Sequence, residues 1–112
     1  MMQPRLMRVL VTGASRGLGA AVACAFARHH GPAAQIALLG RSLATPSHSG
    51  LEGTLLDTKR DVEAYGSFAL PVNVDMRDGA HLCRSVSNVL RTFGGLDVLI
   101  NNASVLRPDR SL

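Results

Sequence analysis

The chain of 112 residues is long enough for one domain at most, so we treat residues 1–112 as a single domain. With 46% hydrophobic and 18% charged residues, its composition excludes a chain that is disordered throughout, and no apolar run approaches the roughly 20 residues that cross a bilayer. The net charge is +4, but the basic residues are scattered and aromatic residues make up only 4%, so we expect no nucleic-acid and no membrane partner.

Strands and helices alternate along the sequence. Short apolar runs predict strands at residues 8–12, 35–40, 68–74 and 96–100. Helical periodicity predicts helices at residues 17–29, 51–65 and 79–93, the last with Asp78 as its N-cap. In the first helix, Leu18, Val22 and Phe26 recur at helical spacing, and the small side chains fit close packing on a sheet; these are Ala20, Ala21, Ala23, Ala25 and Ala27. The residues expected on the inner faces of the other two helices are Leu51, Leu55, Val62 and Tyr65; and Leu82, Val86, Val89, Leu90 and Phe93.

This alternation predicts the fold. Strands that alternate with helices form a parallel sheet with right-handed crossovers. We therefore predict an α/β protein with a Rossmann-type doubly wound parallel sheet, its four strands in the order 3-2-1-4.

A glycine-rich turn follows the first predicted strand. Gly13 allows a tight turn, Gly17 lets the backbone approach a pyrophosphate, and Gly19 lets the following helix lie close to the sheet. Backbone amides at the start of that helix are suited to hold a phosphate. Three glycines in seven residues also occur in ordinary loops, but the flanking strand and helix favour a dinucleotide turn.

The end of the second predicted strand indicates which dinucleotide is bound. A carboxylate at this point favours NAD, whereas a cation favours the 2′-phosphate of NADP. Here the strand ends at Gly40-Arg41, and Arg41 offers a planar donor fork for phosphate. Arg16 and Ser15 of the glycine turn can reach the same group. We predict NADP(H); the alternative is that Arg41 is a solvated residue after a strand.

Two motifs resemble those of the short-chain dehydrogenase/reductase family. Residues 12–19 (TGASRGLG) are similar to the family's cofactor turn, and residues 101–104 (NNAS) to its Asn-Asn-Ala-Gly motif after the fourth strand. Residues 41–104 also resemble the hydroxysteroid dehydrogenase-like branch of this family.

The resemblance implies a set of cofactor-binding positions. They are Gly13, Ser15, Arg16, Gly17, Leu18, Gly19, Arg41, Asp75, Met76, Asn102 and Ala103. By this resemblance Asp75 accepts a hydrogen bond from the adenine amino group, the backbone of Met76 contributes, and Asn102-Ala103 lie beside the riboses. A polar turn at Asp75 and a plain Asn-Asn turn stay open as alternatives.

The residues that would carry out catalysis are missing. The family uses a Ser and a Tyr-x-x-x-Lys pair, but the single tyrosine, Tyr65, is followed four residues later by Ala69, and the only lysine is Lys59. We assign no catalytic residue and expect Tyr65 to pack in the core. The resemblance implies an NADP-dependent alcohol/carbonyl oxidoreductase. We therefore predict its cofactor-binding portion, incomplete at the C-terminus and inactive alone. The alternative is a non-catalytic nucleotide-binding or interaction module.

Several further expectations concern partners and location. An apolar fourth strand left as a sheet edge predicts self-association, and a small carbonyl or alcohol substrate is expected only for a full-length chain. Cys24 and Cys83 form no Cys-x-x-Cys pair and the histidines have no ligand spacing, so we expect no metal site. We expect a cytoplasmic location by default, and the family resemblance makes peroxisomes or mitochondria the alternatives.

Overall fold

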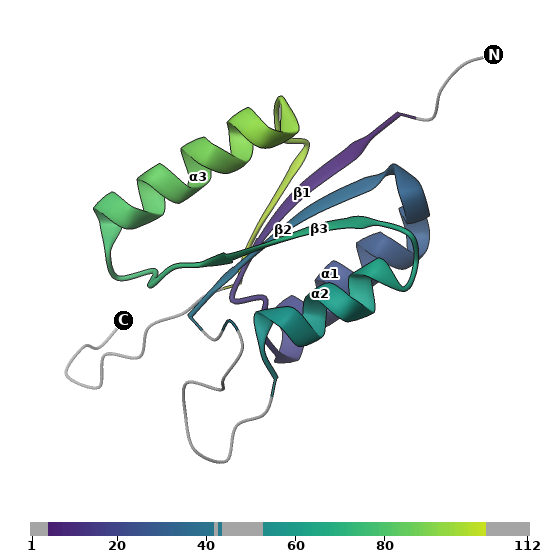
Figure 1. Cartoon of the computed structure of the whole chain (residues 1–112), viewed down its shortest axis with the longest axis horizontal. Helices are drawn as coiled ribbons and strands as arrows, with labels where there is room; N and C mark the ends of the chain where they lie inside the picture. The colour runs from purple at the N-terminus through teal and green to yellow at the C-terminus, as the bar shows by residue number, and fades with distance from the viewer. Residues whose placement is uncertain (1–4, 42, 44–52, 103–112) are drawn as a thin grey trace.

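The computed structural model of the chain describes residues 5–41, 43 and 53–102. Along the chain these residues form β1 (Met7–Thr12), α1 (Gly17–His30), a 3₁₀ turn (Gly31–Ala33), β2 (Ala34–Gly40), α2 (Leu55–Glu63), β3 (Phe68–Asn73), α3 (Gly79–Phe93) and β4 (Val98–Asn101). Figure 1 shows this alternation, which confirms the α/β class.

The four strands form one parallel sheet in the order β3-β2-β1-β4. Val9 of β1 lies between Ile36 of β2 and Val98 of β4, so β1 is paired on both sides. The predicted Rossmann-type sheet and its 3-2-1-4 order are therefore confirmed. The sheet is parallel because each helix returns the chain to the same end before the next strand begins.

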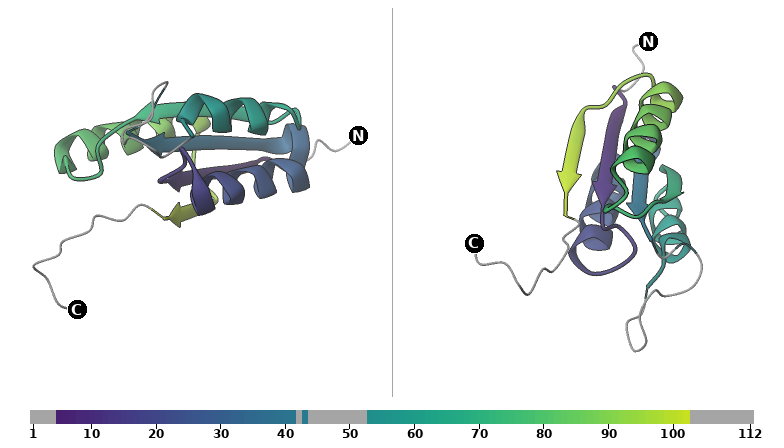
Figure 2. Two further views of the ribbon diagram at one scale, coloured as in Figure 1. Left: turned by 90° about the horizontal axis from the view of Figure 1, so that it is seen from below. Right: turned by 90° about the vertical axis from the view of Figure 1, so that its left-hand side faces the viewer.

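Helices cover both faces of the sheet. In Figure 1, α3 lies above the strands and α1 and α2 lie below them, and Figure 2 shows the same layers from two other sides. Successive residues of β1 point to opposite faces, so Val9 and Val11 pack towards α1 and α2, whereas Leu10 packs towards α3. This burial on both faces explains why β2 is a continuous apolar run.

The inner face of α1 is formed by small residues, as predicted for Gly19, Ala23 and Ala27. Its buried residues are Gly19, Ala23 and Ala27, whereas Leu18 is 68% exposed. Small side chains let the backbone of α1 approach the sheet closely, and the partly buried Phe26 packs against the same core cluster. Leu18, at the start of the helix, does not face the core.

Helix α2 begins later than the sequence pattern predicts. Thr54 and Asp57 form a reciprocal capping box: the Thr54 hydroxyl accepts from the Asp57 amide at 3.2 Å, and the Asp57 carboxylate accepts from the Thr54 amide at 3.1 Å. Leu55 and Val62 are buried as predicted, and the predicted Leu51 lies outside the described residues. The expected burial of Tyr65 is wrong: it follows the helix end and is 44% exposed.

Helix α3 has the predicted bounds and cap. The Asp78 carboxylate accepts from the His81 amide at 3.1 Å. Val89 and Phe93 are buried, but the predicted Leu90 is 41% exposed and Ser85 is buried in the helix face towards the sheet. Leu82 and Val86 also pack against the apolar cluster on this side of the sheet, so the predicted face is correct except for Leu90.

Strand β4 is an edge of the sheet among the described residues, where it pairs with β1 alone. Leu99 is 60% exposed, as the sequence predicts for an uncovered edge strand. The Arg8 side chain donates to both carboxylate oxygens of Asp97 at 3.1 and 3.3 Å and so ties β1 to the segment before β4. Within the described part of the chain, no helix is long and apolar enough to cross a membrane.

Candidate dinucleotide site

The ends of the four parallel strands meet at one edge of the sheet, which we call the carboxyl edge. The last residues of the strands there are Thr12, Gly40, Asn73 and Asn101. Open parallel sheets bind ligands just outside this edge, where the chain connections turn away to either face. Every described residue among the predicted site positions lies within three residues of the end of a strand at this edge or in the N-cap and first turn of α1, which begins there.

The glycine turn between β1 and α1 has the backbone geometry that the sequence predicts. Gly13 and Gly17 have positive φ angles of 66° and 61°, which L side chains rarely adopt. A Cβ on Gly17 would have open space around it, whereas a Cβ on Gly19 would lie 2.1 Å from the Gly13 carbonyl oxygen. Gly17 therefore keeps the outer surface of the turn accessible, and Gly19 allows the close contact inside it.

The start of α1 is suited to hold an anion. Its N-cap residue, Arg16, makes no side-chain capping bond, and the first turn contains no acidic residue. By contrast, Thr54 caps α2 and Asp78 caps α3 through side-chain oxygens. The amides in the first turn of α1, including that of the exposed Leu18, carry the partial positive charge of the helix end and suit a phosphate.

Two residues that the sequence analysis missed support this turn, one from α2 and one from the segment just before it. The buried Thr58 hydroxyl donates to the Ala14 carbonyl at 2.8 Å. Gly53 lies so close to the turn that a Cβ there would be 2.7 Å from the Ser15 carbonyl oxygen and from the Arg16 Cβ. A threonine within a helix gives no sequence signal for this contact, because its partner is 44 residues away.

The predicted Asn-Asn pair joins β4 to the glycine turn. The Thr12 hydroxyl donates to the Asn101 side-chain oxygen at 3.1 Å and accepts from the Asn102 amide at 2.9 Å. The Asn102 side chain donates to the Gly13 carbonyl at 3.4 Å, which places it directly beside the turn. Ala103 lies outside the described residues.

A cluster of charged side chains occupies the other half of the carboxyl edge. We call Arg41, Asp75 and Arg77 the charged cluster. Arg77 donates through Nε and Nη2 to the two carboxylate oxygens of Asp75 at 3.1 and 2.9 Å, and Nη1 of Arg41 lies 3.6 Å from Oδ2 of Asp75. The hydrogen bonds from Arg77, with a smaller contribution from Arg41, hold the pKa of Asp75 well below its usual range.

The ends of β2 and β3 are fixed to each other beneath this cluster. The Val74 amide donates to the Gly40 carbonyl at 2.8 Å. The Asn73 side chain faces the carbonyl oxygens of Gly40 and Arg41 at 3.2 and 3.1 Å, which its amide nitrogen can satisfy as a donor. The structure therefore brings the predicted Arg41 and Asp75 together, and it adds Arg77, which the sequence analysis did not assign.

The remaining predicted site residues are Ser15, Arg16 and Met76, which lie near the glycine turn or beside the charged cluster. A Cβ added to Gly40 would lie 3.8 Å from the Ser15 hydroxyl, so Ser15 links the glycine turn to the end of β2. Arg16 is exposed on the outside of the turn. The side chain of Met76 packs against the apolar cluster on the α3 face of the sheet. A ligand at the carboxyl edge would therefore contact Met76 through its backbone.

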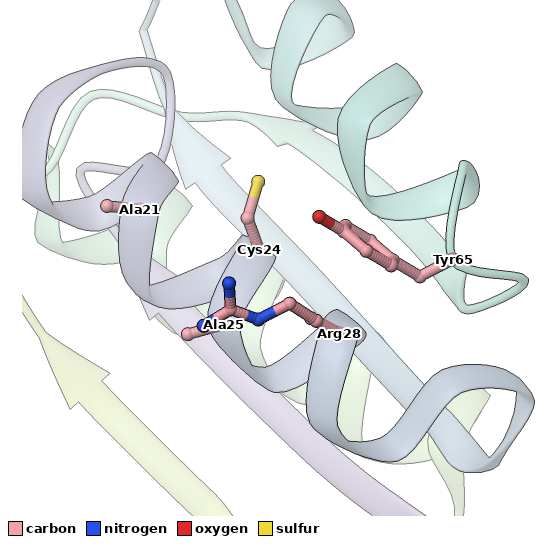
Figure 3. A pocket seen from close by; sticks show the side chains of 5 residues that line it. All are labelled: Ala21, Cys24, Ala25, Arg28 and Tyr65. Atoms are coloured by element: carbon pink, nitrogen blue, oxygen red, sulfur yellow. The ribbon is translucent and has the colours of Figure 1, made fainter.

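A separate hollow of about 270 Å³ lies between α1 and the segment after α2 (Figure 3). Its lining residues are Ala21, Cys24, Ala25, Arg28 and Tyr65. Burial, and secondarily the charge of Asp61, raise the pKa of the Cys24 thiol, so Cys24 is not an activated nucleophile. None of the predicted site residues lines this hollow. Among the described residues, no group of three or more His, Cys, Asp or Glu side chains could hold a metal ion.

Known proteins match both the sequence and this geometry. The sequence profile described as short chain dehydrogenase matches residues 7–111. Hydroxysteroid dehydrogenase-like protein 2 of Homo sapiens is 40% identical over 98 residues, which are 88% of this chain and 22% of that protein. The protein of the same name from Xenopus tropicalis is 38% identical over the same shares. The chain thus spans 22% of the length of these two relatives.

Solved structures share the fold of this chain. A short chain dehydrogenase from Mycobacterium thermoresistibile has a TM-score of 0.79 at 36% identity, over 92% of this chain and 35% of that one. L-Sorbose reductase from Gluconobacter frateurii, complexed with NADPH and L-sorbose, has a TM-score of 0.73 at 29% identity, over 90% and 34%. A short chain dehydrogenase from Mycobacterium paratuberculosis, bound to NAD, has a TM-score of 0.73 at 30% identity, over 91% and 38%.

Proposed function

This chain belongs to the short-chain dehydrogenase family, and we propose that it binds NADP(H) along the carboxyl edge of its sheet. We further propose that it is the cofactor-binding portion of an oxidoreductase that interconverts alcohols and carbonyls. The observation that carries the choice of cofactor is Arg41 at the end of β2, where no acidic residue stands. Similar structures hold NADPH in one case and NAD in another, so the choice depends on this chain's own residues.

In this proposal, the two halves of the carboxyl edge bind different parts of the cofactor. The first-turn amides of α1, including that of Leu18, hold the pyrophosphate, and Gly17 leaves room for it. Arg41, Arg16 and Ser15 bind the 2′-phosphate, since guanidinium groups match phosphate geometry. The other assigned residues are Gly13 and Gly19 for the shape of the turn, Asp75 and Met76 for adenine, and Asn102 and Ala103 for the riboses.

We propose that these 112 residues do not catalyse turnover alone. The bound cofactor supplies the hydride, but a carbonyl reduction also needs a group that moves a proton to the substrate oxygen. Tyr65 does not fit this role, because it lines the hollow beside α1 and has Ala69, not a lysine, four residues later. No NADPH oxidation is expected with a panel of carbonyl substrates, and robust turnover by this chain would contradict this part of the proposal.

Calorimetric titration with NADP⁺ and with NAD⁺ tests the cofactor assignment. The unmodified chain should bind NADP⁺ more tightly, and Arg41→Ala should reduce that preference by about tenfold or more, because a charge-assisted contact to phosphate contributes about 1.5–3 kcal/mol. Arg91→Ala, which removes an equal charge from the last turn of α3, is the matched control and should leave both affinities unchanged. A chain that prefers NAD⁺, or an unchanged preference in Arg41→Ala, would contradict the proposal.

The edge that β4 forms among the described residues favours a second candidate, a non-catalytic module that associates with another copy of itself. Leu99 is 60% exposed there, and the backbone groups along this edge can pair with a further strand. Sedimentation velocity over a range of concentrations distinguishes the two candidates when combined with the titration. Tight NADP⁺ binding by a defined dimer would favour the module.

A further inference from the structure

Arg77 holds Asp75 more completely than Arg41 does. Its Nε and Nη2 donate to the two carboxylate oxygens of Asp75, and its backbone amide donates to Oδ1 at 3.0 Å. Arg41 makes a single, longer contact of 3.6 Å with Oδ2. A planar guanidinium that meets a carboxylate with two parallel N–H groups is the stronger arrangement. Arg77 is therefore the main counter-ion of Asp75, and Arg41 is the weaker one.

The position of these charges matters for a phosphate at Arg41. A carboxylate without a counter-ion would draw the Arg41 guanidinium to itself and would repel a doubly charged 2′-phosphate beside it. With Arg77 in place, the charge of Asp75 is already balanced, and the cluster as a whole carries one net positive charge. All three side chains are partly exposed, at 39% for Arg41, 36% for Asp75 and 56% for Arg77, so they are accessible to a ligand.

We propose that Arg77 is a positioning residue that sets the preference of this site for NADP: it neutralises Asp75 and so leaves Arg41 free for the 2′-phosphate. This inference rests on the proposed function and extends it to a residue that need not touch the cofactor. The role follows from the geometry of the charged cluster and predicts a change in selectivity rather than a general loss of binding.

The test measures the dissociation constant for NAD⁺ divided by that for NADP⁺ in matched variants of the 112-residue chain. A high value of this ratio means a preference for NADP⁺. Arg77→Ala should lower this ratio about three- to fivefold and should change NAD⁺ affinity less than about twofold, in line with the strength of exposed charge pairs. Arg77→Lys keeps the charge and should restore part of the ratio. Arg91→Ala, with an equal loss of charge at the far end of α3, should leave it unchanged.

The double variant Arg77→Ala/Asp75→Asn is the most specific test of whether Arg77 acts through Asp75. Removing the carboxylate removes the charge that Arg77 balances, so the ratio should return to within about twofold of the unmodified chain. Any hydrogen bond that Asp75 makes to adenine is lost equally for both dinucleotides and cancels in the ratio. In the free protein, carbon-13 NMR should also show that the pKa of Asp75 moves towards its ordinary value in Arg77→Ala.

The possible outcomes distinguish a failure of this inference from a failure of the proposed function on which it rests. If the unmodified chain prefers NADP⁺ but Arg77→Ala leaves the ratio unchanged, or weakens both dinucleotides equally, Arg77 has only a structural role and the inference fails alone. A double variant that keeps the reduced ratio would also overturn it. If the unmodified chain shows no preference for NADP⁺, the proposed function itself fails.

Discussion

The two halves of the carboxyl edge are held together by different forces. The glycine turn is fixed by close backbone contacts and by hydrogen bonds from the buried Thr58 and the partly buried Asn102. The charged cluster consists of exposed side chains joined by ion pairs. The buried hydrogen bonds and close contacts of the glycine turn contribute substantially to the free energy of unfolding, whereas the exposed ion pairs of the charged cluster contribute little.

This difference separates the shape of the site from its selectivity. A substitution in the glycine turn should affect stability and the binding of any dinucleotide, because every dinucleotide has the same pyrophosphate. Replacing an arginine of the charged cluster should leave the fold intact and should change mainly which dinucleotide is preferred. The following predictions test that separation.

Gly19→Ala should have the largest effect. The added Cβ would lie 2.1 Å from the Gly13 carbonyl oxygen and 2.9 Å from the Asn102 side-chain nitrogen, so the backbone of the turn must move. We expect a loss of about 3 kcal/mol in the free energy of unfolding, measured with urea. Gly79→Ala is the matched control: its Cβ meets nothing within 4 Å at the start of α3, so it should be neutral or slightly stabilising. Equal effects would contradict the packing argument.

Thr58→Val should have the next largest effect. The substitution keeps the shape but leaves the Ala14 carbonyl without the hydroxyl that donates to it at 2.8 Å. The expected loss is about 1–3 kcal/mol in unfolding free energy, with weaker binding of NADP⁺ and NAD⁺ alike. Thr92→Val removes a similar hydroxyl contact on the exposed side of α3 and should change stability by less than about 0.5 kcal/mol. A change in the ratio of the two affinities would break the proposed separation.

Two helix caps of similar strength allow a finer comparison. Thr54→Ala and Asp78→Ala should each lower the unfolding free energy by about 1 kcal/mol, because each removes a side-chain acceptor from the first turn of a helix. Only Thr54→Ala should also weaken dinucleotide binding, since the start of α2 lies against the glycine turn. Titration of both variants with NADP⁺ checks this, and equal losses of affinity would show that the turn does not depend on α2.

The smallest effect concerns the pH dependence of stability. Because Arg77 lowers the pKa of Asp75 below its unfolded value of about 3.9, the stabilisation is fully present above that value. It is lost as the pH falls towards the lower folded pKa. Asp75→Asn should therefore be less stable than the unmodified chain at pH 7, and the difference should shrink below about pH 4.

Urea unfolding at pH 7, 4 and 3 measures this change. Asp97→Asn should behave in the same direction, because Arg8 lowers the pKa of Asp97 in the same way. It should leave the preference for NADP⁺ unchanged, since Asp97 belongs to the pair that ties β1 to the segment before β4. A difference between Asp75→Asn and the unmodified chain that stays constant with pH would show that the carboxylate of Asp75 contributes nothing through its charge.

Parts of the site were predictable because they depend on neighbouring residues. The positive φ angles of Gly13 and Gly17 are properties of single positions, and the Asp78 cap depends on residues three apart. The burial of Ala23 and Ala27 in α1 was expected from its small side chains, but the exposure of Leu18 does not follow from its helical spacing with Val22 and Phe26. Close approach of a helix to a sheet selects for size at the contact line, which periodicity alone does not reveal.

By itself, the sequence determined the order of strands and helices, the glycine turn and the cation at the end of β2. Each of these features depends on consecutive residues or on a local repeat of apolar side chains. Only the tertiary structure decided that Thr58 supports the turn from 44 residues away, and that Arg41 meets an Asp75 already held by Arg77. The physical reason is that a hydrogen bond or ion pair depends on distance and direction, and for residues far apart in the chain these exist only once the helices have packed on the sheet.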